Sequence, residues 1–182
     1  GKTIVAFYAI LTAIEGGYQA ALMAPTEILA RQHFQTIEPL AISAGLQIDI
    51  LTGKDKSKKR TEITQRLKSG VTNLLIGTHS LFQDDITFKN LGFAVVDEQH
   101  KFGVHQRLAL SDKGTGVDIL IMTATPIPRT LSMTAYGDLD ISTLKNKLPG
   151  RKPVVTRAVP SERLADVIQG INRALADGKK AY

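Results

Sequence analysis

Two neighbouring carboxylates, Asp97 and Glu98, directly follow the short apolar run 93–96. That run is too short for a helix and ends in two β-branched valines, so it indicates a buried parallel strand. In open α/β sheets, ligands bind beyond the carboxyl ends of the strands, where these two acids would lie. Adjacent side chains on an extended segment point in different directions, so one carboxylate can face a metal ion while the other faces a water molecule.

A second group of residues that could take part in chemistry opens the sequence, where Gly1, Lys2 and Thr3 precede a helix-length apolar run over 4–11. Gly-Lys-Thr ends the phosphate-binding pattern G-x-x-x-x-G-K-S/T, in which backbone N–H groups and a helix N-terminus hold phosphates. The triplet alone is a weak signal, but Mg-nucleotide chemistry needs both a phosphate loop and an acidic strand end. The first half of the pattern does not precede Gly1, so we expect a fragment of a longer protein, cut inside its nucleotide site.

Composition bounds the class of protein. The 182 residues are 43% hydrophobic, which is enough for one full domain and part of a second. Without cysteine, neither a disulfide framework nor a thiolate metal site is available. No apolar run approaches the ~18 residues of a membrane span, so we expect a soluble cytoplasmic protein. The net charge of +6 and the pI near 9.6 weakly favour a polyanionic partner.

Predicted strands alternate with predicted helices along the chain. Strands are predicted over 19–24, 46–51, 73–76, 93–96 and 118–122, with helices over about 28–43 and 57–68. In the first of these helices, an apolar pattern runs through Ile28, Leu29, His33, Phe34 and Ile37, and Thr26 is the expected N-cap. The alternation predicts an α/β fold with a mainly parallel sheet and helices on both faces.

Small, hydroxylated or glycine residues follow four of the predicted strands: Ala24-Pro25-Thr26, Thr52-Gly53, Gly77-Thr78-His79 and Thr123-Ala124-Thr125. Such residues can hold the phosphates of a nucleic-acid backbone without reading its bases, although any one of them can be an ordinary turn residue. We predict nucleic-acid contacts from Pro25, Thr26, Thr52, Gly53, Thr78 and His79. A basic run that comprises Lys54, Lys56, Lys58, Lys59 and Arg60 could add phosphate contacts or be a solvated loop.

Four motifs resemble, in order and spacing, the first motor domain of a superfamily 2 (DExH) helicase: Gly1-Lys2-Thr3, Ala24-Pro25-Thr26-Glu27, Asp97-Glu98-Gln99-His100 and Thr123-Ala124-Thr125-Pro126. More narrowly, segments 97–107, 122–131 and 136–140 are similar to those of bacterial ATP-dependent DNA helicases that act on branched DNA. The resemblance spans essentially the whole chain. It implies a RecA-like P-loop NTPase domain over 1–148, then a linker and the start of a second such domain over 149–182, with a strand over 154–159 and a helix over about 161–176.

The resemblance also implies a role for each site residue. With Gly1 in the ATP-binding loop, Lys2 would reach the β- and γ-phosphates, and Thr3 and Asp97 would hold Mg²⁺. Glu98 would orient and deprotonate the attacking water. His100 and the loop Thr123-Ala124-Thr125 would couple the state of the γ-phosphate to bound DNA, because the strand order of the family would place strand 118–123 between the phosphate-loop strand and strand 93–96.

The implied function is a monomeric motor that couples ATP hydrolysis to unwinding or remodelling of forks and recombination junctions in DNA repair. We expect the fragment itself to be inactive, because in this family the site closes between two domains. Three other classes stay open. A metal hydrolase could use His79, Asp97, Glu98, His100 and His105, but it leaves Gly-Lys-Thr unexplained. A nucleotide-binding module without turnover is disfavoured by the intact Glu98, and a double-strand DNA translocase of the transcription-repair coupling factor type is compatible with the same motifs.

Overall fold

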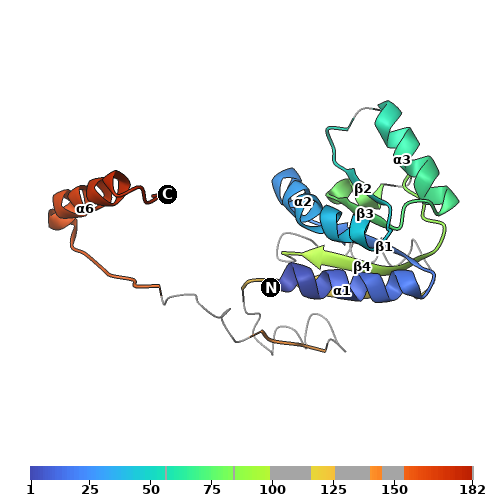
Figure 1. Ribbon diagram of the computed structural model, residues 1–182, viewed down its shortest axis with the longest axis horizontal. Helices are drawn as coiled ribbons and strands as arrows, with labels where there is room; N and C mark the ends of the chain where they lie inside the picture. The colour runs from blue at the N-terminus through green and yellow to red at the C-terminus, as the bar shows by residue number, and fades with distance from the viewer. Residues whose placement is uncertain (56, 84, 99–115, 126–139, 145–153, 182) are drawn as a thin grey trace. The chain divides into compact units, whose positions relative to one another are not determined.

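The computed structural model describes residues 1–55, 57–83, 85–98, 116–125, 140–144 and 154–181. It divides into two compact units, Gly1–Ser132 and Met133–Tyr182. The first unit contains α1 (Lys2–Glu15), β1 (Gln19–Met23), α2 (Glu27–Ser43), β2 (Ile48–Leu51), α3 (Ser57–Ser69), β3 (Leu74–Gly77), the 3₁₀ helix η1 (His79–Phe82), β4 (Leu91–Asp97) and β5 (Asp118–Met122) (Figure 1). Each strand predicted in this unit is confirmed, with ends that differ by a few residues.

The strands form one five-stranded sheet in the order β2-β3-β1-β4-β5, and every neighbouring pair in it is parallel. The predicted parallel α/β fold is therefore confirmed. Strand β1 lies in the middle and is buried along its whole length. Met23 at its end is level with Gly77 of β3 and Val96 of β4, and Asp97 is level with Met122 of β5. The carboxyl ends of the strands consequently meet at one edge.

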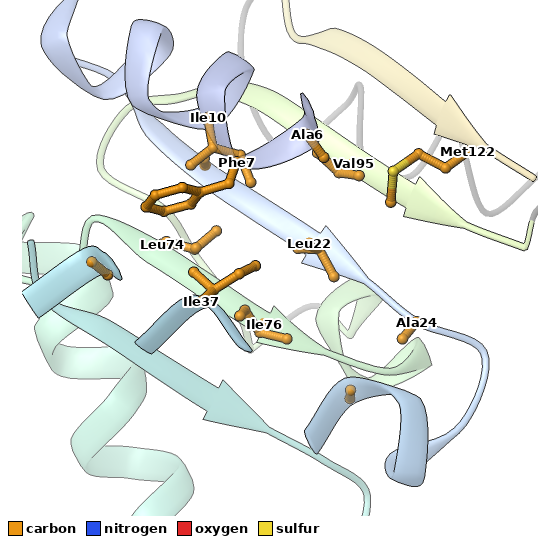
Figure 2. Packing of buried hydrophobic residues seen from close by; sticks show 13 residues of the cluster. Ala6, Phe7, Ile10, Leu22, Ala24, Ile37, Leu74, Ile76, Val95 and Met122 are labelled. Carbon is orange, nitrogen blue, oxygen red and sulfur yellow. The ribbon is translucent and has the colours of Figure 1, made fainter. Parts of the chain in front are cut away.

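Side chains of the sheet alternate between two apolar layers, as the period of a strand requires. Leu22, Leu74 and Val95 belong to the layer covered by α1 and α2, which Figure 2 shows from close by. Their neighbours in sequence belong to the opposite layer, where Ile63 and Leu67 of α3 cover the sheet. Helices thus lie on both faces, as predicted.

Helix α2 starts where the sequence places its cap. The hydroxyl oxygen of Thr26 accepts a hydrogen bond from the backbone N–H of Leu29 at 3.3 Å, which confirms Thr26 as the N-cap. The buried face comprises Ala30, His33, Ile37 and Ala41, at helical spacing. Ile28, which the sequence pattern assigned to the apolar face, is 71% exposed, so that assignment was wrong. It lies about 200° around the helix from Ala30, away from the sheet.

A buried amide ties the amino edge of the sheet together. The side-chain N–H₂ of Gln19 donates to the carbonyls of Leu67 and Thr72 at 2.9 and 2.7 Å. Its oxygen accepts from the backbone N–H groups of Lys89 and Asn90 at 2.7 and 3.0 Å. One side chain therefore satisfies backbone groups from the end of α3, the turn before β3 and the turn before β4.

The second unit contains η3 (Ser161–Arg163) and α6 (Leu164–Ala176), which confirms the helix predicted over about 161–176. The strand predicted over 154–159 was wrong, because that segment has no regular structure. A strand needs a neighbour for its hydrogen bonds, and the described residues of this unit supply none. The predicted domain boundary after residue 148 lies outside the described residues. Within the described ranges, no helix combines the length and the hydropathy that crossing a membrane requires.

We predict that Gln19→Leu destabilises the protein by about 3 kcal/mol, because it removes four hydrogen bonds to backbone groups, two of them buried and two partly buried. Chemical denaturation measures the change. The matched control is Gln65→Leu on the exposed face of α3, for which the free energy of unfolding should stay close to wild type. An equal effect of both substitutions would show that the Gln19 hydrogen bonds carry no stability.

Candidate active site

The carboxyl edge of the sheet gathers the strand-end residues that the sequence singles out. In spatial order along this edge, the segments are Thr52-Gly53 after β2, Thr78-His79 after β3, Pro25-Thr26 after β1, Asp97-Glu98 at the end of β4 and Thr123-Ala124-Thr125 after β5. The parallel sheet therefore brings the predicted acidic pair next to the predicted coupling loop. His100 lies outside the described residues.

The carboxylate of Asp97 is buried and held on both oxygens. Oδ2 lies 2.7 Å from Nε2 of His33, and Oδ1 accepts a hydrogen bond from the backbone N–H of Glu98 at 3.1 Å. An ionised carboxylate can only accept, so the Nε2 of His33 carries the proton in this bond. A carboxylate offers about four lone-pair positions, so these two bonds leave acceptor capacity for a cation. His33 was not predicted as a site residue.

Glu98 has an unusual backbone. Its φ is +50°, and it is the one non-glycine with positive φ among the described residues. Its N–H also donates to the carbonyl of Met122 at 2.9 Å, which ties the end of β4 to the end of β5. The left-handed conformation costs an L-residue about 1–2 kcal/mol and ends the extended course of β4 directly after Asp97.

The start of α1 lies at the same edge. Gly1 is the N-cap, so Lys2 and Thr3 are the first helical residues, and the first turn contains no acidic side chain. One turn further on, Ala6 lies beside Val95, two residues before Asp97 (Figure 2). The N-terminus of α1, with its unpaired N–H groups and positive dipole end, thus lies over the carboxyl-terminal half of β4.

The Asp97 carboxylate and the Thr3 hydroxyl are oxygen ligands of the kind that Mg²⁺ takes. Magnesium is usually bound by one or two carboxylates together with substrate phosphates and water, and it needs no cage of protein ligands. In the described part of the chain, no group of three or more His, Cys, Asp or Glu residues could hold a metal ion. The Asp97 carboxylate and the Thr3 hydroxyl therefore suit a magnesium-nucleotide complex. Of the histidines in the metal-hydrolase alternative, His100 and His105 lie outside the described residues.

The loop after β5 is held by its own hydroxyl groups. The Oγ1 atoms of Thr123 and Thr125 are 3.0 Å apart, and Thr123 Oγ1 also accepts from the backbone N–H of Thr125 at 3.2 Å. Asp97 pairs with Met122, so this loop begins level with Glu98. The prediction that strand 118–123 lies beside strand 93–96 is confirmed by the pairing of β4 with β5.

The residues predicted to contact nucleic acid differ in exposure. Thr26, Gly53 and His79 are exposed, whereas Thr52 and Thr78 are buried. The Thr52 hydroxyl and N–H both donate to Asp55 Oδ2, at 3.0 and 2.7 Å. The buried hydroxyls therefore support their own loops, and the exposed residues are the ones presented at the surface.

Much of the basic run is paired within the chain. Lys54 lies 3.2 Å from Glu27, and Lys59 lies 2.8 Å from Asp55. Arg60 contacts both carboxylate oxygens of Asp85, at 2.8 Å for Nη2, and also donates to Gln83. These contacts connect the segments that follow β1, β2 and β3, so the run braces the edge of the sheet. Lys56 lies outside the described residues.

The pKa shifts of Asp55 and Arg60 reflect this pairing. Partial burial acts to raise the pKa of Asp55, but hydrogen bonds from Lys59 and Thr52 outweigh it and hold that pKa below its usual value. The hydrogen bonds of Asp85 raise the pKa of Arg60. Because the folded pKa of Asp55 is depressed, its contribution to stability is present above the unfolded pKa and is lost as the pH falls through the folded value.

Comparisons with known proteins agree with this geometry. A model of the DEAD/DEAH box helicase family matches residues 1–134. The chain is 47% identical over 182 residues to the ATP-dependent DNA helicase RecG of Synechocystis sp. and 47% identical over 187 residues to that of Escherichia coli K12. Both alignments include the whole of this chain. They cover 22% of the Synechocystis protein and 27% of the Escherichia coli protein.

Among solved structures, RecG bound to a three-way DNA junction matches with a TM-score of 0.84 and 40% sequence identity. That match covers 98% of this chain and 24% of the RecG chain. The similarity supports a RecA-like arrangement of the parallel sheet and its helices. The chain thus spans about a quarter of the length of these RecG relatives.

Because the backbone at Glu98 is left-handed, we predict that glycine and alanine substitutions at this position reverse their usual order of stability. At ordinary positions, glycine destabilises relative to alanine by about 0.5–1 kcal/mol, but at positive φ only alanine is strained. We expect Glu98→Gly to be at least as stable as Glu98→Ala in chemical denaturation, since both lack the carboxylate. As a control, Gln35→Gly on the exposed face of α2 should be less stable than Gln35→Ala. If the glycine variant were less stable than the alanine variant at both positions, the backbone of Glu98 would not be strained.

Proposed function

Because the chain belongs to the DEAD/DEAH box helicase family, we propose that it is the first motor domain of an ATP-dependent DNA helicase, with the start of the second domain from residue 149. The motor would couple ATP hydrolysis to unwinding or remodelling of branched DNA in repair and recombination. The observation that carries the proposal is the shared edge at which the start of α1, Asp97 with Glu98, and the loop Thr123-Ala124-Thr125 meet. The similarity to RecG helicases over the full chain supports the same assignment.

Nucleotide binding is proposed for the first turn of α1 and for Asp97. Lys2 would place its ammonium group against the β- and γ-phosphates, and Gly1 would allow the backbone to approach them. The Thr3 hydroxyl and the free acceptor positions of Asp97 would hold Mg²⁺, Asp97 through water. When bound, Mg²⁺ would neutralise charge on the phosphates.

Glu98 is proposed as the general base. Its carboxylate would orient a water molecule in line with the γ-phosphate and take its proton as the oxygen–phosphorus bond forms and the bond to ADP breaks. The backbone of Glu98 is bonded to Met122, so the position of the base depends on the junction of β4 and β5. The coupling loop begins at Thr123, the residue directly after Met122.

DNA is the proposed partner at the remainder of this edge. The matched structure is that of RecG bound to a three-way DNA junction, and the exposed residues Thr26, Gly53 and His79 present groups that suit phosphate contacts. The buried Thr52 and Thr78 would act by shaping their loops. We further propose that the protein acts as a monomer in the cytoplasm and that His100 joins the coupling loop in sensing the γ-phosphate.

The roles of base and phosphate ligand can be separated in the protein that carries this chain. Glu98→Gln keeps the shape of the side chain but removes the base, so ATP should bind with Mg²⁺ while turnover falls roughly 100-fold or more. Lys2→Ala should instead weaken ATP binding. Equilibrium binding of ATP and steady-state hydrolysis in both variants test this. Equal loss of ATP affinity in the two variants would contradict the separate roles, and normal turnover by Glu98→Gln would exclude the proposed base.

A double substitution tests the coupling loop. Thr123→Ala with Thr125→Val removes the paired hydroxyls, so ATP binding should stay near normal and hydrolysis should fall modestly. Branched DNA remodelled per ATP should fall roughly tenfold, because a switch needs alternative hydrogen-bonded arrangements. Thr123→Ser with Thr125→Ser keeps the hydroxyls and should retain coupling. If remodelling and hydrolysis drop in proportion, the loop belongs to the hydrolytic site or to the fold.

A further inference from the structure

His33 is a polar residue on an otherwise apolar helix face. The buried residues of α2 are Ala30, His33, Ile37 and Ala41, and the three apolar members belong to the core between α2 and the sheet. His33 itself is 8% exposed. Burying an imidazole is unfavourable unless its N–H groups find partners, so an apolar residue would be the ordinary choice at this position.

The partner that His33 finds is the proposed magnesium ligand. Its Nε2 lies 2.7 Å from Asp97 Oδ2, and both side chains are 10% exposed. The two residues are 64 positions apart in sequence, so only the fold brings them together. A charge-assisted hydrogen bond in such a water-poor setting is stronger than one at the surface.

The bond also fixes which lone pairs of Asp97 remain available. His33 engages Oδ2 and the N–H of Glu98 engages Oδ1, so the plane of the carboxylate is defined at both oxygens. Without His33, the carboxylate would keep a single described hydrogen bond and could rotate about it. A rotating carboxylate must be ordered again each time it takes a ligand, which weakens binding.

We propose that His33 is a positioning residue, which orients the Asp97 carboxylate toward the divalent ion of the bound nucleotide. The inference rests on the proposed function, in which Asp97 holds Mg²⁺. Outer-shell partners of this kind typically change metal affinity 10- to 100-fold when they are removed. His33 does not touch the nucleotide in this assignment and acts only through Asp97.

The test compares two substitutions of similar size in the full-length protein. His33→Gln places an amide N–H₂ about as far from the backbone as Nε2, so it can keep the hydrogen bond to Asp97. His33→Leu continues the apolar face of α2 and removes the bond. Ile37→Leu, one turn along on the same face, is the control for altered packing without contact to Asp97.

The readout is the affinity for a non-hydrolysable ATP analogue, measured with Mn²⁺ and without any divalent ion. His33→Leu should reduce the Mn²⁺-dependent gain in affinity about tenfold or more and leave the metal-free affinity unchanged. His33→Gln and Ile37→Leu should stay close to wild type. The Mg²⁺ concentration for half-maximal ATP hydrolysis should rise in His33→Leu by a similar factor.

Three results would overturn the assignment: an unchanged Mn²⁺-dependent gain in His33→Leu, equal losses in His33→Gln and His33→Leu, or an equal loss in Ile37→Leu. The last two would mean that His33 serves packing alone. A wild-type protein with no Mn²⁺-dependent nucleotide binding would overturn the proposed function as well. The failure of His33 as a positioning residue is thus distinguishable from the failure of the site.

Discussion

The register of the parallel sheet is the constraint on which the rest of the structure depends. Val95 faces the layer of α1 and α2, and Asp97, two residues later, follows the same face toward His33. A slip of β4 by one residue against β1 would turn Asp97 to the opposite face and separate it from α2. Apolar side chains that are buried on both faces of β1 and β4 make such a slip costly. The hydrophobic core therefore determines where a carboxylate can meet a cation.

Helix α2 connects the proposed DNA contacts with the proposed nucleotide site at the carboxyl edge of the sheet. It begins at the cap Thr26, which is exposed beside the proposed DNA contacts, and two turns later it carries His33 against Asp97. The basic run braces the neighbouring segments through Glu27, Asp55 and Asp85. Exposed ion pairs of this type are worth about 0–1 kcal/mol each, so their role is in the geometry of the edge more than in global stability.

Local patterns predicted the strands and the α-helices of the first unit, the cap Thr26 and the gathering of polar residues at one edge. They could not predict contacts whose partners are distant in sequence, such as His33 with Asp97 or Gln19 with Asn90, because no periodicity relates such residues. A histidine at a core position of α2 was the available signal for the former. The left-handed backbone of Glu98 and the missing strand over 154–159 have the same origin, since tertiary surroundings decide both.

The central position of β1 has a consequence for the synthesis of the chain. Both neighbours of β1 lie far downstream, in β3 (Leu74–Gly77) and β4 (Leu91–Asp97). At a translation rate of roughly 5–20 residues per second, β1 waits several seconds before β4 has been made. Both edges of this apolar strand are unpaired until β3 has been made, and one edge stays exposed to other nascent chains until β4 follows. The strand at the centre of the finished sheet is thus prone to aggregation during synthesis, and a chaperone that covers it would have to release it once β4 has emerged.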